Sequence, residues 1–379
     1  MALRNLDVLP VDAHDPAAIL PDLEQAISGG VSLLPVPADD PGRAELLRSS
    51  QGAGRPIDPA VALVVGTSGS TGTPKGAQLT PANLVAGADA THRVLGGEGQ
   101  WLLAMPAHYI AGLQVLVRAL VAGVDPYCLD LSRGFDVSAF ARGAAELAAT
   151  GDRVYTSLTP MQLMKAMDTL EGIDALRTFD AVLVGGAALD PDTRAAAGRL
   201  NIHVVATYGA SETSGGCIYD GRPIPGARVK LDASGRIHLG GATIAHGYRN
   251  RPGHESFAEE GWWATSDAGA FDAEGRLVVK GRLDAVIDTG GLKLHPEVVE
   301  TELLRVPGVD AACVAGVAHP RQGQAAVAAY TGTASPAEIY EALAELPRWQ
   351  WPKELRRVAA LPLTATGKVD RPAVAALFS

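Results

Sequence analysis

Three separate segments of the chain share one pattern, an apolar and β-branched run that ends in glycine or hydroxyl residues. They are VALVVGTSG at residues 61–69, FDAVLVGGAAL at 179–189 and IHVVATYGASET at 202–213. Each run predicts a buried strand that leads into a loop. Ligands of α/β sheets gather at the carboxyl ends of strands, so the three endings predict one shared binding site.

The first of these strands is followed by a glycine-rich loop and then by a predicted helix. In the segment LTPANLVAGADATHRVL, Thr80 is the predicted N-cap and Pro81 the first helical residue. The order of strand, loop and helix is typical of α/β folds. It predicts a large N-terminal domain of α/β sheets.

The pattern of apolar and turn residues changes twice further along the sequence. From about Arg222, short alternating runs between turn residues predict β-hairpins and a small β-rich subdomain. Beyond it, LDAVIDTGGLKL predicts a hairpin, and HPEVVETELLRV predicts a helix with Pro296 in its first turn. We therefore predict an N-terminal domain over residues 1–283, joined by a hinge to a small α+β C-terminal domain over residues 284–379.

Composition and charge exclude several classes of partner. The formal net charge is -10 and the sequence has no basic stripe, which argues against nucleic acid and against insertion into an anionic membrane. The cysteines Cys128, Cys217 and Cys313 are too scattered for a disulfide framework, which fits a reducing cytoplasm. The N-terminus has no signal-peptide pattern, and the apolar stretch from Leu113 to Val124 is too short to span a bilayer. We expect a cytoplasmic protein.

The glycine-rich loop GTSGSTGTPKG at residues 66–76 has the composition of a phosphate loop. A Walker A motif places Ser or Thr after its lysine, but Lys75 stands between Pro74 and Gly76, so a P-loop NTPase is excluded. Backbone N–H groups, hydroxyls and a lysine still suit phosphate oxygens. The alternative, a flexible surface turn, is disfavoured by the strand before the loop and the capped helix after it.

Five motifs, in order, resemble those of the adenylate-forming superfamily, which includes acyl-CoA synthetases, nonribosomal peptide adenylation domains and luciferases. TSGSTGTPKG resembles the phosphate loop of this superfamily, TYGASET its adenine and magnesium motif, and TSDAG its ribose motif, with Ser266 in place of the usual glycine. GRLDAVIDTGGLKLHPEVVE resembles the hinge and CoA-side loop, and PLTATGKVDR the C-terminal lysine motif. The resemblance runs from about residue 60 to residue 371.

The resemblance implies a two-step ligase reaction that uses ATP, Mg²⁺ and CoA. A substrate carboxylate attacks the α-phosphate of ATP to give acyl-AMP and pyrophosphate, and the thiol of CoA then displaces AMP. Charge develops on phosphate in the first step, so the site needs cations and hydrogen-bond donors. The implied ATP-binding residues are Thr67, Ser68, Gly69, Ser70, Thr71, Gly72, Lys75, Gly186, Ala187, Thr207, Tyr208, Gly209, Ser211, Asp267 and Arg282.

The same resemblance assigns catalytic and conformational roles. Glu212 would coordinate Mg²⁺, and Lys368 would bridge the substrate carboxylate and the α-phosphate. Asp284 would be the hinge, although an aspartate in a turn and a lysine near a C-terminus are common without such roles. The implied CoA-side loop contains Gly290, Gly291 and Lys293.

Residues on the acyl side suggest a substrate class. TSLTPMQL, AHYIAGLQVLVRA and GGCIYDGRPIPGARVKLD resemble the o-succinylbenzoate–CoA ligases of menaquinone biosynthesis, which implies an aromatic keto-dicarboxylate. His108 would be the catalytic gate of the acyl and CoA tunnels, or else an ordinary histidine at a helix start. Arg118, with Gln114 one turn earlier, would hold the second carboxylate, and Gly185 is the third expected substrate contact. Otherwise Arg118 would form a surface salt bridge.

Other functions stay open from the sequence. The chain would otherwise be a CoA ligase for another acyl or aryl acid, or a stand-alone adenylation enzyme that loads a carrier protein. The TGGLKL loop suits both CoA and the pantetheine arm of a carrier. Intact Lys75, Glu212 and Lys368 argue against a non-catalytic nucleotide-binding protein. A homo-oligomer is left open.

The lysine motif leads to a test that separates the two half-reactions. Because Lys368 is expected to act in adenylation only, Lys368→Ala should lose most release of pyrophosphate but still convert supplied acyl-AMP and CoA to acyl-CoA. Each half-reaction is measured separately. An equal loss in both would contradict the role.

Overall fold

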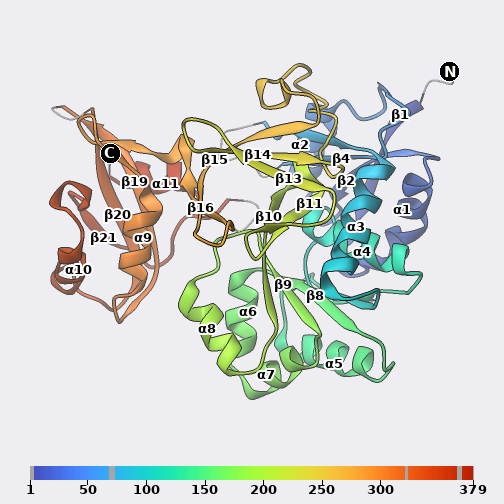
Figure 1. The fold of residues 1–379 in the computed structure, drawn as a ribbon, viewed down its shortest axis with the longest axis horizontal. Helices are drawn as coiled ribbons and strands as arrows, with labels where there is room; N and C mark the ends of the chain where they lie inside the picture. Colours follow the sequence, from blue (N-terminus) through green and yellow to red (C-terminus); the bar gives the residue numbers. More distant parts are fainter. Residues whose placement is uncertain (1–3, 68–72, 321–322, 365–368, 379) are drawn as a thin grey trace. The chain divides into compact units, whose positions relative to one another are not determined.

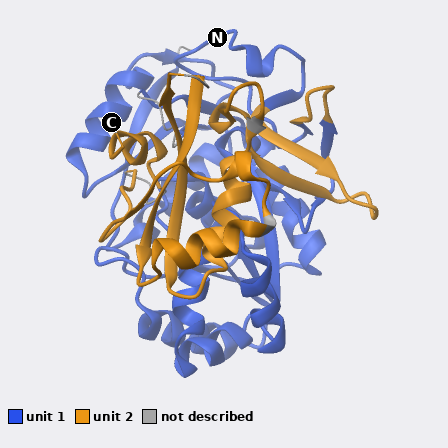
Figure 2. Ribbon diagram, turned by 90° about the vertical axis from the view of Figure 1, so that its left-hand side faces the viewer, with its two compact units in different colours: residues 1–230, 238–264 blue, residues 231–237, 265–379 orange. Residues whose placement is uncertain are grey.

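The computed structural model describes residues 4–67, 73–320, 323–364 and 369–378. The chain divides into two compact units, shown in Figure 2. The larger unit comprises Met1–Lys230 and His238–Ala264, and the smaller unit comprises Leu231–Ile237 and Thr265–Ser379. Both units contain helices and strands (Figure 1). This confirms the predicted mixed α/β class, with a large N-terminal part and a smaller C-terminal part.

The larger unit begins with a five-stranded sheet in the order β3-β1-β2-β4-β5. Strands β1, β2 and β4 run parallel, and β3 and β5 are antiparallel edge strands. Leu6 and Leu34 of the sheet pack with Leu47 of the helix α2 (Pro41–Gln51). The strands are β1 (Arg4–Val11), β2 (Ser32–Pro37), β3 (Pro56–Ile57), β4 (Leu63–Gly66) and β5 (Gly76–Leu79), and the helix α1 is Leu20–Ile27.

A seven-stranded sheet follows in the order β12-β11-β10-β9-β8-β6-β7. Its strands from β7 to β10 are parallel, whereas β11 and β12 are antiparallel. Leu102 and Val182 of this sheet share a core with Phe140, Leu163 and Leu176 of its helices. The strands are β6 (Gln100–Leu103), β7 (Tyr127–Cys128), β8 (Val154–Leu158), β9 (Ala181–Val184), β10 (Val204–Ala210), β11 (Gly215–Tyr219) and β12 (Arg222–Pro223). The helices are α3 (Pro81–Leu95), α4 (Ile110–Ala122), α5 (Val137–Ala148), α6 (Pro160–Met167), α7 (Leu170–Arg177) and α8 (Pro191–Arg199).

The predicted β-rich segment forms a four-stranded sheet in the order β13-β14-β15-β16. Its strands are β13 (Ala227–Leu231), β14 (Arg236–Gly241), β15 (Trp262–Phe271) and β16 (Leu277–Arg282). The division between the two units falls inside three of these strands. A compact unit and a domain that rotates are different properties, so the boundary between residues 283 and 284 stays a prediction.

The smaller unit contains a three-stranded sheet covered on both faces. Alternate residues of β19 and β20 point to opposite sides, so Val314 packs with α9 while Cys313 packs with Val374 of α11. The strands are β17 (Ile287–Asp288), β18 (Lys293–Leu294), β19 (Val309–His319), β20 (Gly323–Gly332) and β21 (Leu355–Arg357). The helices are α9 (Pro296–Leu304), α10 (Pro336–Ala342) and α11 (Arg371–Ala376).

Local signals in the sequence are confirmed where a short segment carries them. Thr80 caps α3 through a reciprocal pair of hydrogen bonds with Asn83, and Pro81 is the first helical residue. Pro296 likewise opens α9, and β17 and β18 form the predicted hairpin. The three cysteines are free, and no described helix is long and apolar enough to cross a membrane.

Two features of the strands were not predicted from the sequence. The strand that follows the glycine-rich loop, β5 at Gly76–Leu79, was not predicted; its four residues are too few to show a period. The three strand endings, which are predicted to form one shared site, come from two different sheets. β4 belongs to the five-stranded sheet, whereas β9 and β10 are neighbours in the seven-stranded sheet.

Candidate active site

The base of the glycine-rich loop is closed by antiparallel pairing. Gly66 of β4 lies opposite Gly76 of β5, and the N–H of Thr67 donates to the carbonyl of Lys75 at 2.7 Å. A Cβ atom at position 76 would lie 2.0 Å from Oε1 of Gln51 and 2.7 Å from Cγ1 of Val64, so a larger residue would force these buried side chains to move. The predicted phosphate-binding residues Ser68, Gly69, Ser70, Thr71 and Gly72 lie outside the described residues.

Thr67 is the described hydroxyl at the start of this loop. Its side chain is buried, and its Oγ1 has no hydrogen-bond partner among the described residues. A buried hydroxyl without a partner is costly, so this atom is ready to bind a ligand oxygen. The phosphate-binding role of Thr67 stays a prediction.

A distant segment, residues 245–250, binds the base of the loop, and we call it the strap. The N–H of Arg249 donates to the carbonyl of Gly76 at 2.7 Å, and Nδ2 of Asn250 donates to the carbonyl of Pro74 at 2.8 Å. Oδ1 of Asn250 accepts from the N–H of Gly76 at 3.2 Å. The strap therefore fixes the segment from which Lys75 extends.

The strap also holds the segment that carries Glu212. The N–H of Ala245 donates to the carbonyl of Glu212 at 2.9 Å. The hydroxyl of Tyr248 donates to Oε1 of Glu212 at 2.6 Å, and the side chains of both residues are buried. Burial, followed by the nearby Glu212 carboxylate, raises the pKa of Tyr248, so its hydroxyl keeps the proton that it donates.

Lys75 and Glu212 both contact Tyr248. Nζ of Lys75 lies 4.6 Å from the centre of the Tyr248 ring, a cation–π contact. Sequence reasoning missed Tyr248, because one tyrosine in a loop carries no periodic or motif signal. Because Tyr248 contacts two expected site residues, it becomes a further candidate for the site.

The ends of β9 and β10 approach closely, as expected for an adenine site. Oγ1 of Thr207 donates to the carbonyl of Val184 at 3.3 Å. A Cβ atom at Gly185 would lie 2.3 Å from the same Oγ1 of Thr207. Gly186 has a φ of 81°, in the left-handed region that favours glycine. The predicted residues Gly185, Gly186, Ala187, Thr207, Tyr208, Gly209 and Ser211 thus lie on two neighbouring strand ends.

Three predicted residues of the smaller unit form a charged cluster. Asp267 and Arg282 are paired across β15 and β16, with Nε of Arg282 at 3.9 Å from Oδ1 of Asp267. The same Nε donates to Oδ1 of Asp284 at 2.7 Å. Asp284 lies in a single 3₁₀ turn, Leu283–Ala285, directly after β16. The expected ribose and hinge residues are therefore linked through one arginine.

The expected CoA-side loop is the turn between β17 and β18. Gly290 and Gly291 have φ values of 76° and 92°, and the N–H of Gly291 donates to Oδ1 of Asp288 at 2.7 Å. The backbone of Lys293 lies in β18. Lys368 lies outside the described residues.

Arg118 and Gln114 are buried on one face of α4, as their spacing predicts. Arg118 is only 4% exposed, so its interpretation as a surface salt-bridge arginine is wrong. Its Nη2 donates to the hydroxyl of Tyr219 at 3.3 Å, and its guanidinium lies 5.0 Å from the Trp101 ring. No carboxylate pairs with Arg118 among the described residues, and its buried Nε has no partner. Burial lowers the pKa of Arg118.

Gln114 connects α4 to the segment that follows Glu212. Its Nε2 donates to Oγ of Ser214 at 2.8 Å, and its buried Oε1 has no partner among the described residues. Gln114 and Arg118 therefore leave two polar atoms available inside the larger unit.

His108 lies just before α4 and lines a small cavity of about 70 Å³ with Asp39 and Pro106. Burial lowers the pKa of His108 to about 4, more than the nearby Asp39 raises it. The imidazole is therefore neutral at pH 7. The role of His108 as a gate stays a prediction. Its ring lies against the Tyr109 ring, with 4.0 Å between the ring centres.

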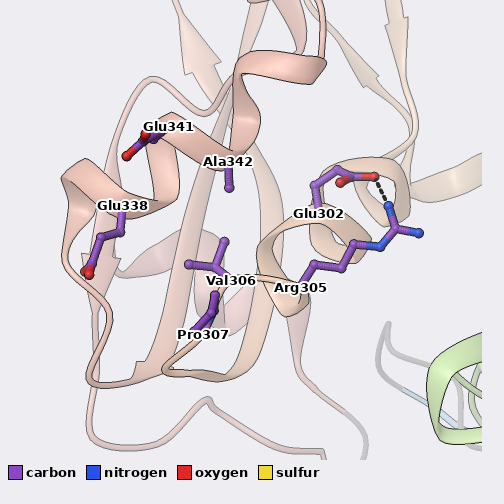
Figure 3. A pocket seen from close by; sticks show the side chains of 7 residues that line it. All are labelled: Glu302, Arg305, Val306, Pro307, Glu338, Glu341 and Ala342. Carbon is purple, nitrogen blue, oxygen red and sulfur yellow. Dashed lines mark hydrogen bonds and ion pairs between the residues drawn. The ribbon is translucent and has the colours of Figure 1, made fainter.

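A larger cavity of about 350 Å³ belongs to the smaller unit (Figure 3). Arg305 and Glu302 of its lining form an ion pair at 2.8 Å. The other lining residues are Val306, Pro307, Glu338, Glu341 and Ala342. None of the predicted site residues is among them.

The comparisons with known proteins identify the family of this chain. The family model of AMP-binding enzymes matches residues 11–249, and that of the AMP-binding enzyme C-terminal domain matches residues 298–368. The chain belongs to the AMP-binding enzyme family.

Several individual proteins are similar to the chain in sequence or in fold. The chain is 45% identical to a probable 2-succinylbenzoate–CoA ligase of Mycobacterium tuberculosis, over 96% of each chain. It is 31% identical to a sulfoacetate–CoA ligase of Cupriavidus necator, over 89% of this chain and 72% of the relative. In fold it is similar to o-succinylbenzoate CoA synthetase (MenE) of Bacillus subtilis in complex with OSB-AMP, with a TM-score of 0.85, 21% identity, and coverage of 98% and 88%.

The lowered pKa of His108 leads to a test of stability against pH. An unfolded histidine takes up a proton near pH 6.5, but folded His108 does so only near pH 4, so acidification favours the unfolded chain. We expect His108 to cost about 1–2 kcal/mol of stability between pH 7 and pH 5, allowing for partial exposure.

Urea unfolding of the wild type and of His108→Gln at both pH values measures this cost. The variant should lose less stability than the wild type on acidification. His14→Gln is the control, because Asp130 raises the pKa of His14 and its effect has the opposite sign. Equal pH dependence in the wild type and His108→Gln would show that His108 titrates normally.

Proposed function

We propose that this chain is an AMP-forming acid–CoA ligase of menaquinone biosynthesis. It would convert 2-succinylbenzoate, ATP and CoA to 2-succinylbenzoyl-CoA, AMP and diphosphate. The observation that carries the proposal is the 45% identity with the mycobacterial relative over 96% of both chains, which includes the acyl side as well as the nucleotide side. A cytoplasmic location fits these small-molecule substrates.

The residues of the larger unit suit the first half-reaction. A carboxylate oxygen attacks the α-phosphorus of ATP, and the bond to the departing pyrophosphate breaks. Thr67 and Lys75 would bind the phosphates of ATP, and Glu212 would hold Mg²⁺, which neutralises phosphate charge when it is bound. The types of residue suit these ligands. The buried carboxylate of Glu212, which accepts a hydrogen bond from Tyr248 of the strap, is the kind of ligand that Mg²⁺ prefers. The buried hydroxyl of Thr67, which has no partner among the described residues, can bind a phosphate oxygen.

In the second half-reaction the sulfur of CoA attacks the acyl carbon, and the bond to AMP breaks as the thiol proton is released. The glycines of the β17–β18 turn would let the backbone approach the pantetheine arm. Asp284 would be the pivot between the two half-reactions. A carrier protein in place of CoA remains the alternative acceptor.

Arg118 would bind the non-reacting carboxylate of the substrate. A buried guanidinium without a carboxylate partner is costly, and a substrate anion would neutralise it. Both 2-succinylbenzoate and sulfoacetate, the acids in the names of the two relatives, carry a second acidic group. The acyl site is therefore proposed to select dianionic acids.

A panel of acids tests the proposed reaction. Release of pyrophosphate and formation of the acyl-CoA are measured with 2-succinylbenzoate, benzoate, sulfoacetate and a fatty acid, with either free CoA or a carrier protein. The proposal expects 2-succinylbenzoate and free CoA to give the highest kcat/KM. Preference for another acid, or transfer to the carrier alone, would reject the assignment.

Arg118→Leu tests the acyl side separately. Loss of one charged, hydrogen-bonded pair costs about 2–5 kcal/mol, which is well over tenfold in kcat/KM. The variant should therefore lose much more activity with 2-succinylbenzoate than with benzoate, so that the gap between the two acids narrows. A uniform loss with both acids would mean that Arg118 only supports the packing of α4.

A further inference from the structure

The strap joins two parts of the active site that are far apart in the sequence. Its backbone binds the base of the phosphate loop at Gly76 and the carbonyl of Glu212. Its tyrosine, Tyr248, contacts Glu212 through the hydroxyl and Lys75 through the ring face. One residue therefore contacts the expected Mg²⁺ ligand and the expected phosphate-binding cation.

Tyr248 is itself held in a fixed orientation. Nε1 of Trp263 donates to the Tyr248 hydroxyl at 3.3 Å, and the rings of His254 and Phe257 contact Tyr248 edge-on, with centres 5.0 and 5.1 Å away. Tyr248 is 1% exposed. A tyrosine fixed on several sides can fix its own partners in turn.

We propose that Tyr248 is a positioning residue for nucleotide binding, whose hydroxyl orients the Glu212 carboxylate toward Mg²⁺ and whose ring orients Lys75 toward the phosphates. This inference rests on the proposed function, because it takes Glu212 and Lys75 as ligands of Mg²⁺ and ATP. It adds a residue that the sequence motifs do not contain.

The chemistry of Mg²⁺ favours such support. This ion usually binds through one or two carboxylates and the substrate phosphates, and it keeps several waters. The described residues contain no group of three or more His, Cys, Asp or Glu side chains that could hold a metal. With so few protein ligands, the orientation of Glu212 decides affinity, and loss of a supporting hydrogen bond typically costs about 10- to 100-fold.

The two contacts of Tyr248 can be separated by substitution. Tyr248→Phe removes the hydroxyl but keeps the ring over Lys75, and Tyr248→Leu removes both. Tyr248→Phe should weaken binding of Mg²⁺-ATP at least tenfold and leave binding of metal-free ATP unchanged. Tyr248→Leu should in addition weaken binding of metal-free ATP severalfold, because the cation–π contact is lost.

Two further variants serve as controls for the loss of the Tyr248 hydroxyl. Tyr155 is also fully buried, and its hydroxyl donates to the carbonyls of Leu95 and Gly97, so Tyr155→Phe loses buried hydrogen bonds without touching the site. Trp263→Phe removes the donor to the Tyr248 oxygen together with part of a buried ring, and it leaves the Tyr248 hydroxyl and its bond to Glu212 in place. It should weaken Mg²⁺-ATP binding in the same direction as Tyr248→Phe but less, and it provides the test if Tyr248→Phe fails to fold.

Calorimetry measures binding of ATP with and without Mg²⁺, and no acid substrate is needed. Selective loss of Mg²⁺-ATP binding in Tyr248→Phe, absent from Tyr155→Phe, supports the inference. Unchanged binding in both Tyr248→Phe and Trp263→Phe, or equal loss with and without Mg²⁺, overturns it. A wild-type protein that binds no ATP would instead refute the proposed function itself, so the two failures are distinct.

Discussion

The closure of the phosphate loop by β4 and β5 is the constraint on which the rest of the site depends. The pair Gly66 and Gly76 brings the two described ends of the loop together. Close packing of Gln51 and Val64 against Gly76 leaves no room for a Cβ atom. The described base of the loop is held at both ends, which lowers the ordering cost of presenting Thr67 and Lys75 to a ligand.

The strap extends this constraint to the acidic side of the site. A buried carboxylate is expensive unless it is hydrogen-bonded, and the Tyr248 hydroxyl supplies such a bond to Glu212. The same segment binds β5 and the loop through backbone groups. The lysine and the carboxylate, opposite in charge, are thus held near one another before any ligand arrives, which is the preorganisation that phosphate chemistry needs.

The features that could be predicted from the sequence are local ones, which depend only on residues close together in the chain. Thr80 and Pro81 specify the start of α3 through one capping box, and the apolar runs of β9 and β10 specify buried neighbours. Arg118 was recognised as the charge in an apolar helix, but its burial depends on Trp101 and Tyr219, which no local pattern links to it.

The same reason explains why the strap was missed. Tyr248 and Glu212 are brought together by the fold, as are Asn250 and Gly76, which are 174 residues apart. Family motifs predict Lys75 and Glu212 as site residues, and the structure shows that Tyr248 contacts both of them. Tertiary contacts of this kind have no signature in a single sequence, so the sequence predicts the chemistry of the site better than its support.

The most direct test of the central claim follows the oxygen atoms of the acid. When 2-succinylbenzoate labelled with oxygen-18 in both carboxylates is converted in the presence of ATP and CoA, attack on the α-phosphorus places one labelled oxygen in AMP. The account predicts AMP that carries one oxygen-18 and pyrophosphate that carries none. Formation of ADP with label in inorganic phosphate would mean attack on the γ-phosphorus and would contradict the adenylate mechanism.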